Sequence, residues 1–221
     1  MSEKTDIIVS IDEAGNPNDE DPFVISAVII KDLESYLELY DQALKEVEKL
    51  TGKRIRYFKW SEDTPKPSKL GKDIKGIFIT DVLTRLEGFS VILDKKKEKL
   101  SNYSAILYGK IIGLKLREYV VGKRIKVYYD RTPILREADK QYIYINFRNW
   151  TLANVIKIDF TGHDKCKLIH PADYVSGIVR EYLLKDKLKE EYRQYLENYY
   201  HLISKRFHIT RLNLRDYLQS I

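Results

Sequence analysis

The sequence predicts a single α/β domain built on a mixed β-sheet. Its 221 residues suit one domain with a sizeable core, and no repeat, low-complexity stretch or linker divides them. Two apolar runs, residues 7–11 and 23–30, open the chain with a short link between them, which predicts an antiparallel hairpin. Further on, apolar runs alternate with amphipathic helical patterns, an order typical of sheets that contain parallel strands.

The predicted strands are runs rich in Val, Ile and aromatic residues, bounded by turn residues. In chain order they are residues 7–11, 23–30, 55–60, 89–93, 125–129 and 155–160, of which 55–60 is short. The predicted helices have apolar residues spaced by three and four. They are residues 33–47, 74–86, 101–122, 133–149, 170–182 and 188–202, followed by one short helix from residue 210. Gly88 is the predicted C-cap of the second helix, and residues 65–68 form a predicted loop.

The composition limits which partners and which cellular location are expected for the protein. Lys and Arg number 39 and Asp and Glu 33, and the net charge of +6 permits a nucleic-acid partner without requiring one. A lone cysteine, Cys166, excludes an internal disulfide and a four-thiolate zinc site. We see no signal peptide and no apolar run of the ~20 residues that a membrane span needs, so we expect a soluble, cytoplasmic protein. Abundant Lys, Glu, Ile and Tyr, with one Cys and one Met, favour a thermophilic source.

Three aspartates stand where predicted strands end or a helix begins. Asp12 and Asp130 each end a strand, and Asp173 lies in the first turn of the helix after the last strand. If the two strands are parallel neighbours, both carboxylates leave the sheet at one edge, and a right-handed crossover brings the helix of Asp173 over that edge. Two small residues one turn on, Ser176 and Gly177, would let this helix approach the sheet closely.

Converging carboxylates need a counter-charge. At ~4 Å, two like charges repel by about 4 kcal/mol at an effective dielectric near 20. An oxygen-only cluster favours Mg²⁺ or Mn²⁺ over zinc, and a pair of such ions serves phosphodiester cleavage by activating water and stabilising the leaving oxygen. The alternative is three unrelated acids that cap turns or face a helix dipole. Spacing alone leaves both interpretations open.

Several short motifs resemble one known family. The run Asp12-Glu13-Ala14-Gly15 is similar to the D-E-S-G opening of the family called domain of unknown function 3800. Tyr129-Asp130-Arg131 is similar to that family's central aspartate, and residues 171–177 resemble its Q-L-A-D-L-V-A-G helix. Ala14 stands in place of the usual Ser, and His170-Pro171 in place of Gln-Leu. The likeness covers most of residues 6–185.

This resemblance implies a ribonuclease H-like fold: a mixed five-stranded central sheet flanked by helices, with a core at residues 6–185 and a C-terminal helical extension at 186–221. It also implies that Asp12, Asp130 and Asp173 occupy the places of metal-binding aspartates in ribonuclease H-like nucleases. A fourth acid is not evident. Glu13, Glu62 and Asp159 are candidates, although Glu13 would point to the opposite face of a regular strand from Asp12.

Basic residues and one histidine are candidates for contacting phosphates. They are Lys59, Lys95, Lys96, Lys97 and His170. A solvated face is the alternative for the lysine cluster, whereas His170 would act as a phosphate contact or proton shuttle at the start of the helix of Asp173. His163, Cys166 and His170 also form an H-x2-C-x3-H pattern that zinc could occupy, but loop histidines before a helix are more often incidental.

Two classes of function fit these observations. The leading hypothesis is a divalent-metal-dependent nuclease or phosphodiesterase in which Asp12, Asp130 and Asp173 hold Mg²⁺ or Mn²⁺, with Glu13 as a further catalytic candidate. The alternative is a non-catalytic nucleic-acid-binding or assembly protein, because the same fold also hosts other functions. The choice between DNA and RNA and the oligomeric state do not follow from the sequence.

Overall fold

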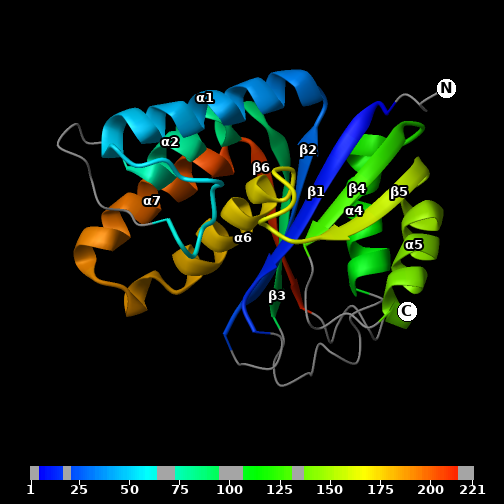
Figure 1. Ribbon diagram of the computed structural model, residues 1–221. Helices are drawn as coiled ribbons and strands as arrows, with labels where there is room; N and C mark the ends of the chain where they lie inside the picture. The colour runs from blue at the N-terminus through cyan, green and yellow to red at the C-terminus, as the bar shows by residue number, and fades with distance from the viewer. Residues whose placement is uncertain (1–4, 17–20, 64–72, 95–106, 131–136, 214–221) are drawn as a thin grey trace.

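The protein has a six-stranded mixed sheet with helices on both faces (Figure 1). The computed structural model describes residues 5–16, 21–63, 73–94, 107–130 and 137–213. The strands are β1 (Ile7–Ala14), β2 (Phe23–Ile30), β3 (Glu87–Asp94), β4 (Arg124–Asp130), β5 (Asn154–Thr161) and β6 (Phe207–Asn213). Their order across the sheet is β5-β4-β1-β2-β3-β6.

The sheet combines an antiparallel centre with parallel flanks. β2 pairs antiparallel with both β1 and β3, which confirms the predicted opening hairpin. β4 pairs parallel with β1 and with β5, and β6 pairs parallel with β3. The parallel connections run through helices, as crossovers in mixed sheets do.

The helices form two layers. α1 (Leu33–Thr51), α2 (Ile74–Asp81), α6 (His170–Leu183) and α7 (Glu190–Ser204) cover one face. The other face carries α4 (Ile112–Val120), preceded by a π-helical turn (Leu107–Ile111), and α5 (Glu137–Thr151). Two short 3₁₀ turns, Leu83–Arg85 and Lys185–Lys187, complete the helical segments of the described chain. None of its helices is long and apolar enough to cross a membrane.

Strand alternation divides the core between these layers. Ile7, Val9 and Ile11 of β1 pack in the cluster under α4 and α5, whereas Ile8 packs in the cluster under α1, α6 and α7. Successive side chains of a strand point to opposite faces, so Asp12 shares the α6 face with Ile8. Asp12 therefore faces the helix that carries Asp173.

The sixth strand corrects the prediction of a five-stranded sheet and of a wholly helical C-terminal extension. β6 occupies residues where a short helix was expected to begin, and it pairs with β3 from Gly88↔Phe207 to Asp94↔Asn213. Buried Phe207 and half-buried Ile209 flank the exposed His208, a period of two that fits a strand against one packed face. Tertiary pairing thus decides the state of this short segment.

Residues 55–60 do not form the predicted strand. Phe58 and Trp60 are buried, but as anchors of a loop that follows α1. The backbone N–H groups of Phe58 and Trp60 donate to side-chain oxygens of Tyr40 (3.1 Å) and Asp173 (2.7 Å) rather than to a neighbouring strand. The short apolar run therefore indicated correctly that these side chains are buried, but it did not show whether the backbone pairs with a strand.

Gly88 is not a helix cap but a residue of β3. A Cβ atom at this position would come within 2.0 Å of the carbonyl oxygen of Ala27 on β2, so the close approach of the two strands needs glycine. The predicted helix before it is split into α2 and the 3₁₀ turn Leu83–Arg85. The predicted loop at 65–68 and the predicted helix starts near 101 and 133 lie outside the described residues.

Candidate active site

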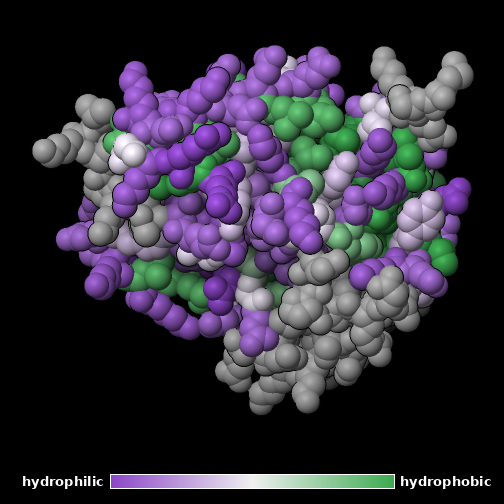
Figure 2. All heavy atoms as spheres, viewed as in Figure 1, coloured by the Kyte–Doolittle hydropathy of each residue, from purple (hydrophilic) through white to green (hydrophobic). Residues whose placement is uncertain are grey.

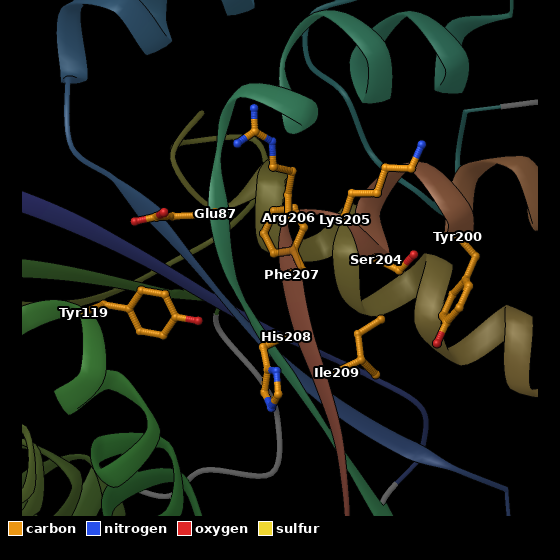
Figure 3. Close-up of a pocket in the computed structure, with 9 residues that line it drawn as sticks. All are labelled: Glu87, Tyr119, Tyr200, Ser204, Lys205, Arg206, Phe207, His208 and Ile209. Atoms are coloured by element: carbon orange, nitrogen blue, oxygen red, sulfur yellow. The ribbon is translucent and has the colours of Figure 1, made fainter.

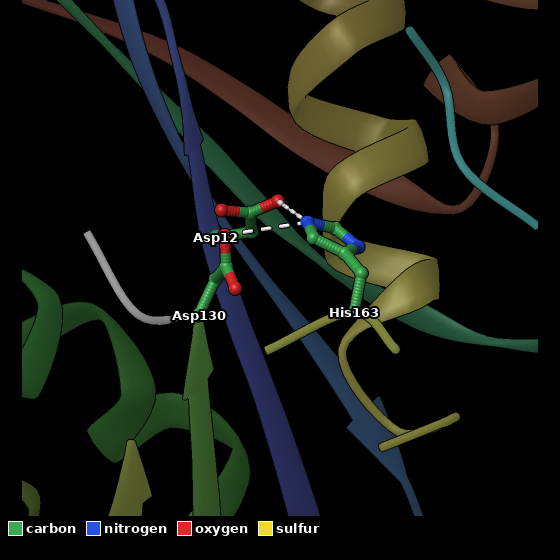
Figure 4. Close-up of side chains that lie close together, drawn as sticks. All are labelled: Asp12, Asp130 and His163. Atoms are coloured by element: carbon green, nitrogen blue, oxygen red, sulfur yellow. Dashed lines mark ion pairs between the residues drawn. The ribbon is translucent and has the colours of Figure 1, made fainter. Parts of the chain in front are cut away.

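Asp12 and Asp130 lie side by side on neighbouring strands, Asp12 within β1 and Asp130 as the last residue of β4. The predicted strand end at Asp12 is wrong, because β1 continues to Ala14 and pairs with β2 throughout. The parallel register of β1 and β4 runs from Ile7↔Ile125 to Ile11↔Tyr129, so the next residue on each strand is an aspartate. The two strands are therefore the parallel neighbours on which the convergence of these carboxylates depended. Figure 4 shows both carboxylates at the same edge, beside the start of α6. Asp12 is only 3% exposed, whereas the Asp130 side chain is 20% exposed.

His163 completes a compact group with these two aspartates. One ligand atom from each of the three residues lies within 4.8 Å of the others. The His163 Nε2 atom is 3.3 Å from Asp130 Oδ2 and 3.9 Å from Asp12 Oδ2 (Figure 4). Sequence reasoning treated this histidine as incidental. The signal that could have found it is its position in the connection between β5 and the helix that carries Asp173.

Asp173 lies next to this group but outside it. The Trp60 backbone N–H donates to Asp173 Oδ2 at 2.7 Å and holds the carboxylate in place. The charge of Asp173 still reaches Asp12, whose pKa it helps to raise. The three predicted aspartates therefore share one electrostatic site, while the compact set of possible ligands among the described residues contains His163 in place of Asp173.

Burial makes an ionised Asp12 unfavourable. Desolvation, followed by the charges of Asp173, Asp130 and Glu13, raises the pKa of Asp12 well above its ordinary value, and the Glu13 N–H, 2.7 Å from Asp12 Oδ1, opposes the shift. Burial also raises the pKa of Asp173, against the opposing effects of His163 and the Trp60 N–H. Perturbed carboxylates that converge in one place are typical of functional sites.

His163 is the basic residue that contacts these acids. Burial disfavours its charged form, yet the hydrogen bond to Asp130 and the charges of Asp173 and Asp130 hold the pKa of His163 above its ordinary value. Its Nδ1 atom is buried and has no hydrogen-bond partner among the described residues. A metal-binding histidine normally donates from its second nitrogen to an acceptor. We therefore regard the carboxylates as the main candidate ligands and His163 as the group that balances their charge.

The loop after α1 positions Asp173 through a buried tryptophan. The Trp60 ring lies against α6, where a Cβ atom at Gly177 would come within 2.2 Å of Trp60 Cδ1. Gly177 thus makes room for the Trp60 ring, a contact that the sequence did not indicate. Trp60 Nε1 donates to Glu181 at 2.8 Å, and Lys75 Nζ lies 3.4 Å from the centroid of the Trp60 ring. These contacts lock the amide that holds Asp173.

The other predicted catalytic and substrate residues have different places. Glu13 follows Asp12 on β1, and its charge raises the pKa of Asp12, but it is not in the compact ligand group. Lys59 lies close enough for its charge to act on Asp173 and His163, and its Nζ atom contacts Glu62 at 2.5 Å. The lysines at positions 95, 96 and 97 lie outside the described residues.

His170 is part of the buried core rather than of the acid cluster. It is fully buried, with Nε2 2.8 Å from the carbonyl oxygen of His163 and Nδ1 2.6 Å from the Tyr40 hydroxyl. A carbonyl oxygen only accepts, so Nε2 carries the proton and Nδ1 accepts from Tyr40. Both ring nitrogens are therefore engaged, and neither is left for a phosphate or for zinc. The H-x2-C-x3-H residues, all described, form no group of possible metal ligands.

The donor set fits a hard divalent cation. Asp12 and Asp130 offer carboxylate oxygens close together, Asp173 adds a third nearby, and oxygen donors suit Mg²⁺ and Mn²⁺. The unfavourable burial of Asp12 indicates a cation site, because a bound cation would offset the repulsion that raises the pKa of Asp12.

A separate cavity of about 530 Å³ opens at the start of β6 (Figure 3). Lys205, Arg206 and Glu87 contribute its charges, and Tyr119 reaches it from α4. None of the clustered acids lines this cavity, so it is not the place of the predicted chemistry.

Solved structures share this architecture. The ribonuclease H2 from Pyrococcus horikoshii OT3 matches with a TM-score of 0.51 and 15% identity over 88% of this chain and 87% of its own. The ribonuclease HII of Archaeoglobus fulgidus, solved in a complex with PCNA, matches with a TM-score of 0.51 and 13% identity over 84% of this chain and 77% of its own. No protein-family model and no curated protein matches the sequence. The chain therefore has a ribonuclease H-like fold, and its resemblance to domain of unknown function 3800 stays a prediction.

Proposed function

We propose that this protein is a divalent-metal-dependent nuclease that hydrolyses phosphodiester bonds beside the C-terminal ends of strands β1 and β4. One observation carries the proposal: a buried carboxylate, Asp12, is held beside Asp130 and within reach of the charge of Asp173, an arrangement that is unfavourable without a cation. The ribonuclease H-like fold supports it, because two structures with this fold are ribonucleases by name.

Asp12, Asp130 and Asp173 would hold the cation, Mg²⁺ or Mn²⁺. A divalent ion in such a site supplies Lewis-acid stabilisation of phosphoryl charge and makes water a better nucleophile at neutral pH. Glu13 remains a further catalytic candidate through its place next to Asp12.

The protein's own residues supply positioning. The Trp60 amide orients the Asp173 carboxylate, and His163 balances the negative charge of Asp130. The ammonium group of Lys59, 30% exposed on its side chain, attracts a phosphate to the site once it releases Glu62. Well-oriented groups of this kind lower the barrier because they need little reorganisation during the reaction.

Cleavage of labelled nucleic acids tests the proposal. Wild type is incubated with single- and double-stranded DNA and RNA and with an RNA–DNA hybrid, in Mn²⁺, Mg²⁺ or EDTA. We expect metal-dependent cleavage of at least one substrate and its loss in Asp12→Asn. Asp186→Asn is the matched control, because Asp186 is an exposed aspartate in the 3₁₀ turn Lys185–Lys187 and is not among the candidate acids.

Two results together would contradict the nuclease proposal. If wild type cuts no substrate in either metal, and calorimetry detects no Mn²⁺ binding that Asp12→Asn removes, the nuclease proposal is wrong. The protein would then be better described as a non-catalytic nucleic-acid-binding or assembly protein on the same fold.

A further inference from the structure

A basic stretch of chain leads away from the clustered acids. Residues 49–61 contain five cations and no acidic side chain. Lys53, Arg54 and Arg56 are exposed, whereas Phe58 and Trp60 are buried and fasten the stretch to the core. The backbone N–H of Lys59 donates to Asp63 Oδ2 at 2.9 Å, and the neighbouring Trp60 N–H donates to Asp173. The exposed cations therefore stand on anchored chain.

Arg54 and Arg56 line a groove of about 670 Å³, which we call the α1 groove. Its walls are residues 54–56, Lys167 and the side of α1 that carries Leu44, Lys45 and Glu48. Hydrophilic side chains gather over α1 and the loop after it (Figures 1 and 2). The aliphatic parts of Leu44 and Ile55 pack against the core beneath the groove.

The charges of the α1 groove are unbalanced. Lys167 is neutralised by Asp41, whose Oδ1 atom lies 2.5 Å from Lys167 Nζ. Lys45, Arg54 and Arg56 form no ion pair with any residue that the structure describes, which leaves Glu48 as the one acid opposite three cations. A guanidinium group without a carboxylate partner is well suited to bind a phosphate through two parallel hydrogen bonds.

The α1 groove lies a few nucleotides from the acids. Arg56 and Lys59 are separated by three residues, at most ~11 Å of chain, and the charge of Lys59 reaches Asp173 and His163. On the other wall, Lys167 follows His163 by four residues, at most ~14 Å. At a rise of about 3.4 Å per nucleotide of a strand, these lengths correspond to about three to four phosphates.

The acids themselves repel a polyanion, so affinity must come from nearby cations. We propose that the α1 groove binds the phosphate backbone of the nucleic-acid strand whose phosphodiester bond lies at Asp12 and Asp130. Lys59 contacts this strand nearest the acids, and Arg56, Arg54 and Lys45 contact it progressively further away. This inference rests on the proposed function for the position of the cleaved bond, but binding itself is measured without cleavage.

The test compares two double variants that remove the same charge. One is Arg54→Gln with Arg56→Gln. The other is Lys205→Gln with Arg206→Gln, which removes two exposed cations from the separate cavity at the start of β6. Fluorescence anisotropy with labelled 20-nucleotide RNA and DNA strands, in EDTA, gives the dissociation constant at 0.05–0.5 M salt. All substituted residues are exposed, so circular dichroism melting should show unchanged thermal stability.

Each phosphate contact on a single strand contributes a slope of about 0.7 in log K against log salt. Loss of two contacts should therefore lower the slope by about 1.4 and weaken binding about 25-fold at 0.1 M salt. The control pair should change affinity less than about twofold. Equal loss in both pairs, no loss in the groove pair, or no nucleic-acid binding by wild type would each overturn the inference.

The outcomes separate this inference from the nuclease proposal. If wild type binds through Arg54 and Arg56 but does not cleave with metal, the groove stands and the nuclease proposal fails. If wild type cleaves but the groove pair binds as tightly as wild type, the nuclease proposal stands and the inference fails.

Discussion

Replacing Asp12 by Asn should stabilise the metal-free protein while abolishing activity. The ligand oxygens of Asp12 and Asp130 lie within 4.8 Å. At that separation and an effective dielectric of about 20, two carboxylate charges repel by about 3.5 kcal/mol. His163 offsets part of this repulsion. Asn keeps an oxygen that accepts the Glu13 N–H, so we expect a net gain of about 2 kcal/mol, or about 4–8 °C in melting temperature for a chain of this size.

The stability gained by Asp12→Asn should increase as the pH rises. The pKa of Asp12 in the folded protein lies above its ordinary value of 3.8. Ionisation of Asp12 therefore costs the wild type no stability below about pH 4, where the carboxyl is protonated in both the folded and the unfolded state. The loss of stability grows as the pH rises towards the pKa of Asp12 in the folded protein. Calorimetry in EDTA at pH 4 and pH 8 measures this change, with Asp186→Asn as the exposed control, for which we expect a change below about 1 kcal/mol.

A bound metal ion should make wild type more stable than Asp12→Asn, the reverse of their order without metal. A cation that binds only the folded state stabilises it by about 2.7 kcal/mol at a hundred times its dissociation constant. Wild type should gain this stability with Mn²⁺, and Asp12→Asn should not. If Asp12→Asn is equally or less stable than wild type in EDTA at pH 8, the electrostatic reasoning about this site is refuted.

Two further predictions follow from contacts near the site. Gly177→Ala places a Cβ atom 2.2 Å from Trp60, so we expect a loss of about 1–3 kcal/mol in denaturant unfolding and a lower kcat through the displaced Asp173, whereas Gly76→Ala, with its nearest neighbour at 3.4 Å, should be nearly neutral. Burial lowers the pKa of His170 from 6.5 to about 4, so the unfolded state binds more protons between these values. Relative to His170→Gln, wild type should lose about 3 kcal/mol of unfolding free energy as the pH falls from 6.5 to 4, and urea titrations that show parallel pH profiles for the two proteins would contradict this.

Most helices and strands were predicted correctly because the spacing of their apolar residues lies within the element itself. The apolar runs ending at Asp12 and Asp130 became neighbouring parallel strands, and the Pro-started helix carrying Asp173 was recognised from its first turn. Errors arose where a short segment takes its state from distant partners. Residues 55–60 became a loop because its amides bond to side chains of α1 and α6, and residues 207–213 became a strand because β3 offers a free edge.

The candidate site shows the same division. Strand ends and helix starts in the sequence indicated which carboxylates would meet if the two strands paired in parallel, since strand direction and crossover handedness are general rules. The identity of the third member of the compact group was decided by tertiary structure, because the path of the β5–α6 connection brings His163, and not Asp173, within reach of Asp130. Asp173 is instead held by an amide from a loop more than a hundred residues earlier in the chain.

The sequence by itself determined the α/β class, the opening hairpin and the excess of positive charge, whereas the parallel pairing that joins Asp12 to Asp130 was only a condition in the sequence argument. The class, the hairpin and the charge follow from local periodicity and composition. Tertiary structure alone decided the edge strand β6, the seat of Trp60 against Gly177, the buried state of His170, and the α1 groove beside the acids. The physical reason is that burial and charge pairing depend on neighbours in space, and residues such as Arg54 and Lys167 become neighbours only when the chain has folded.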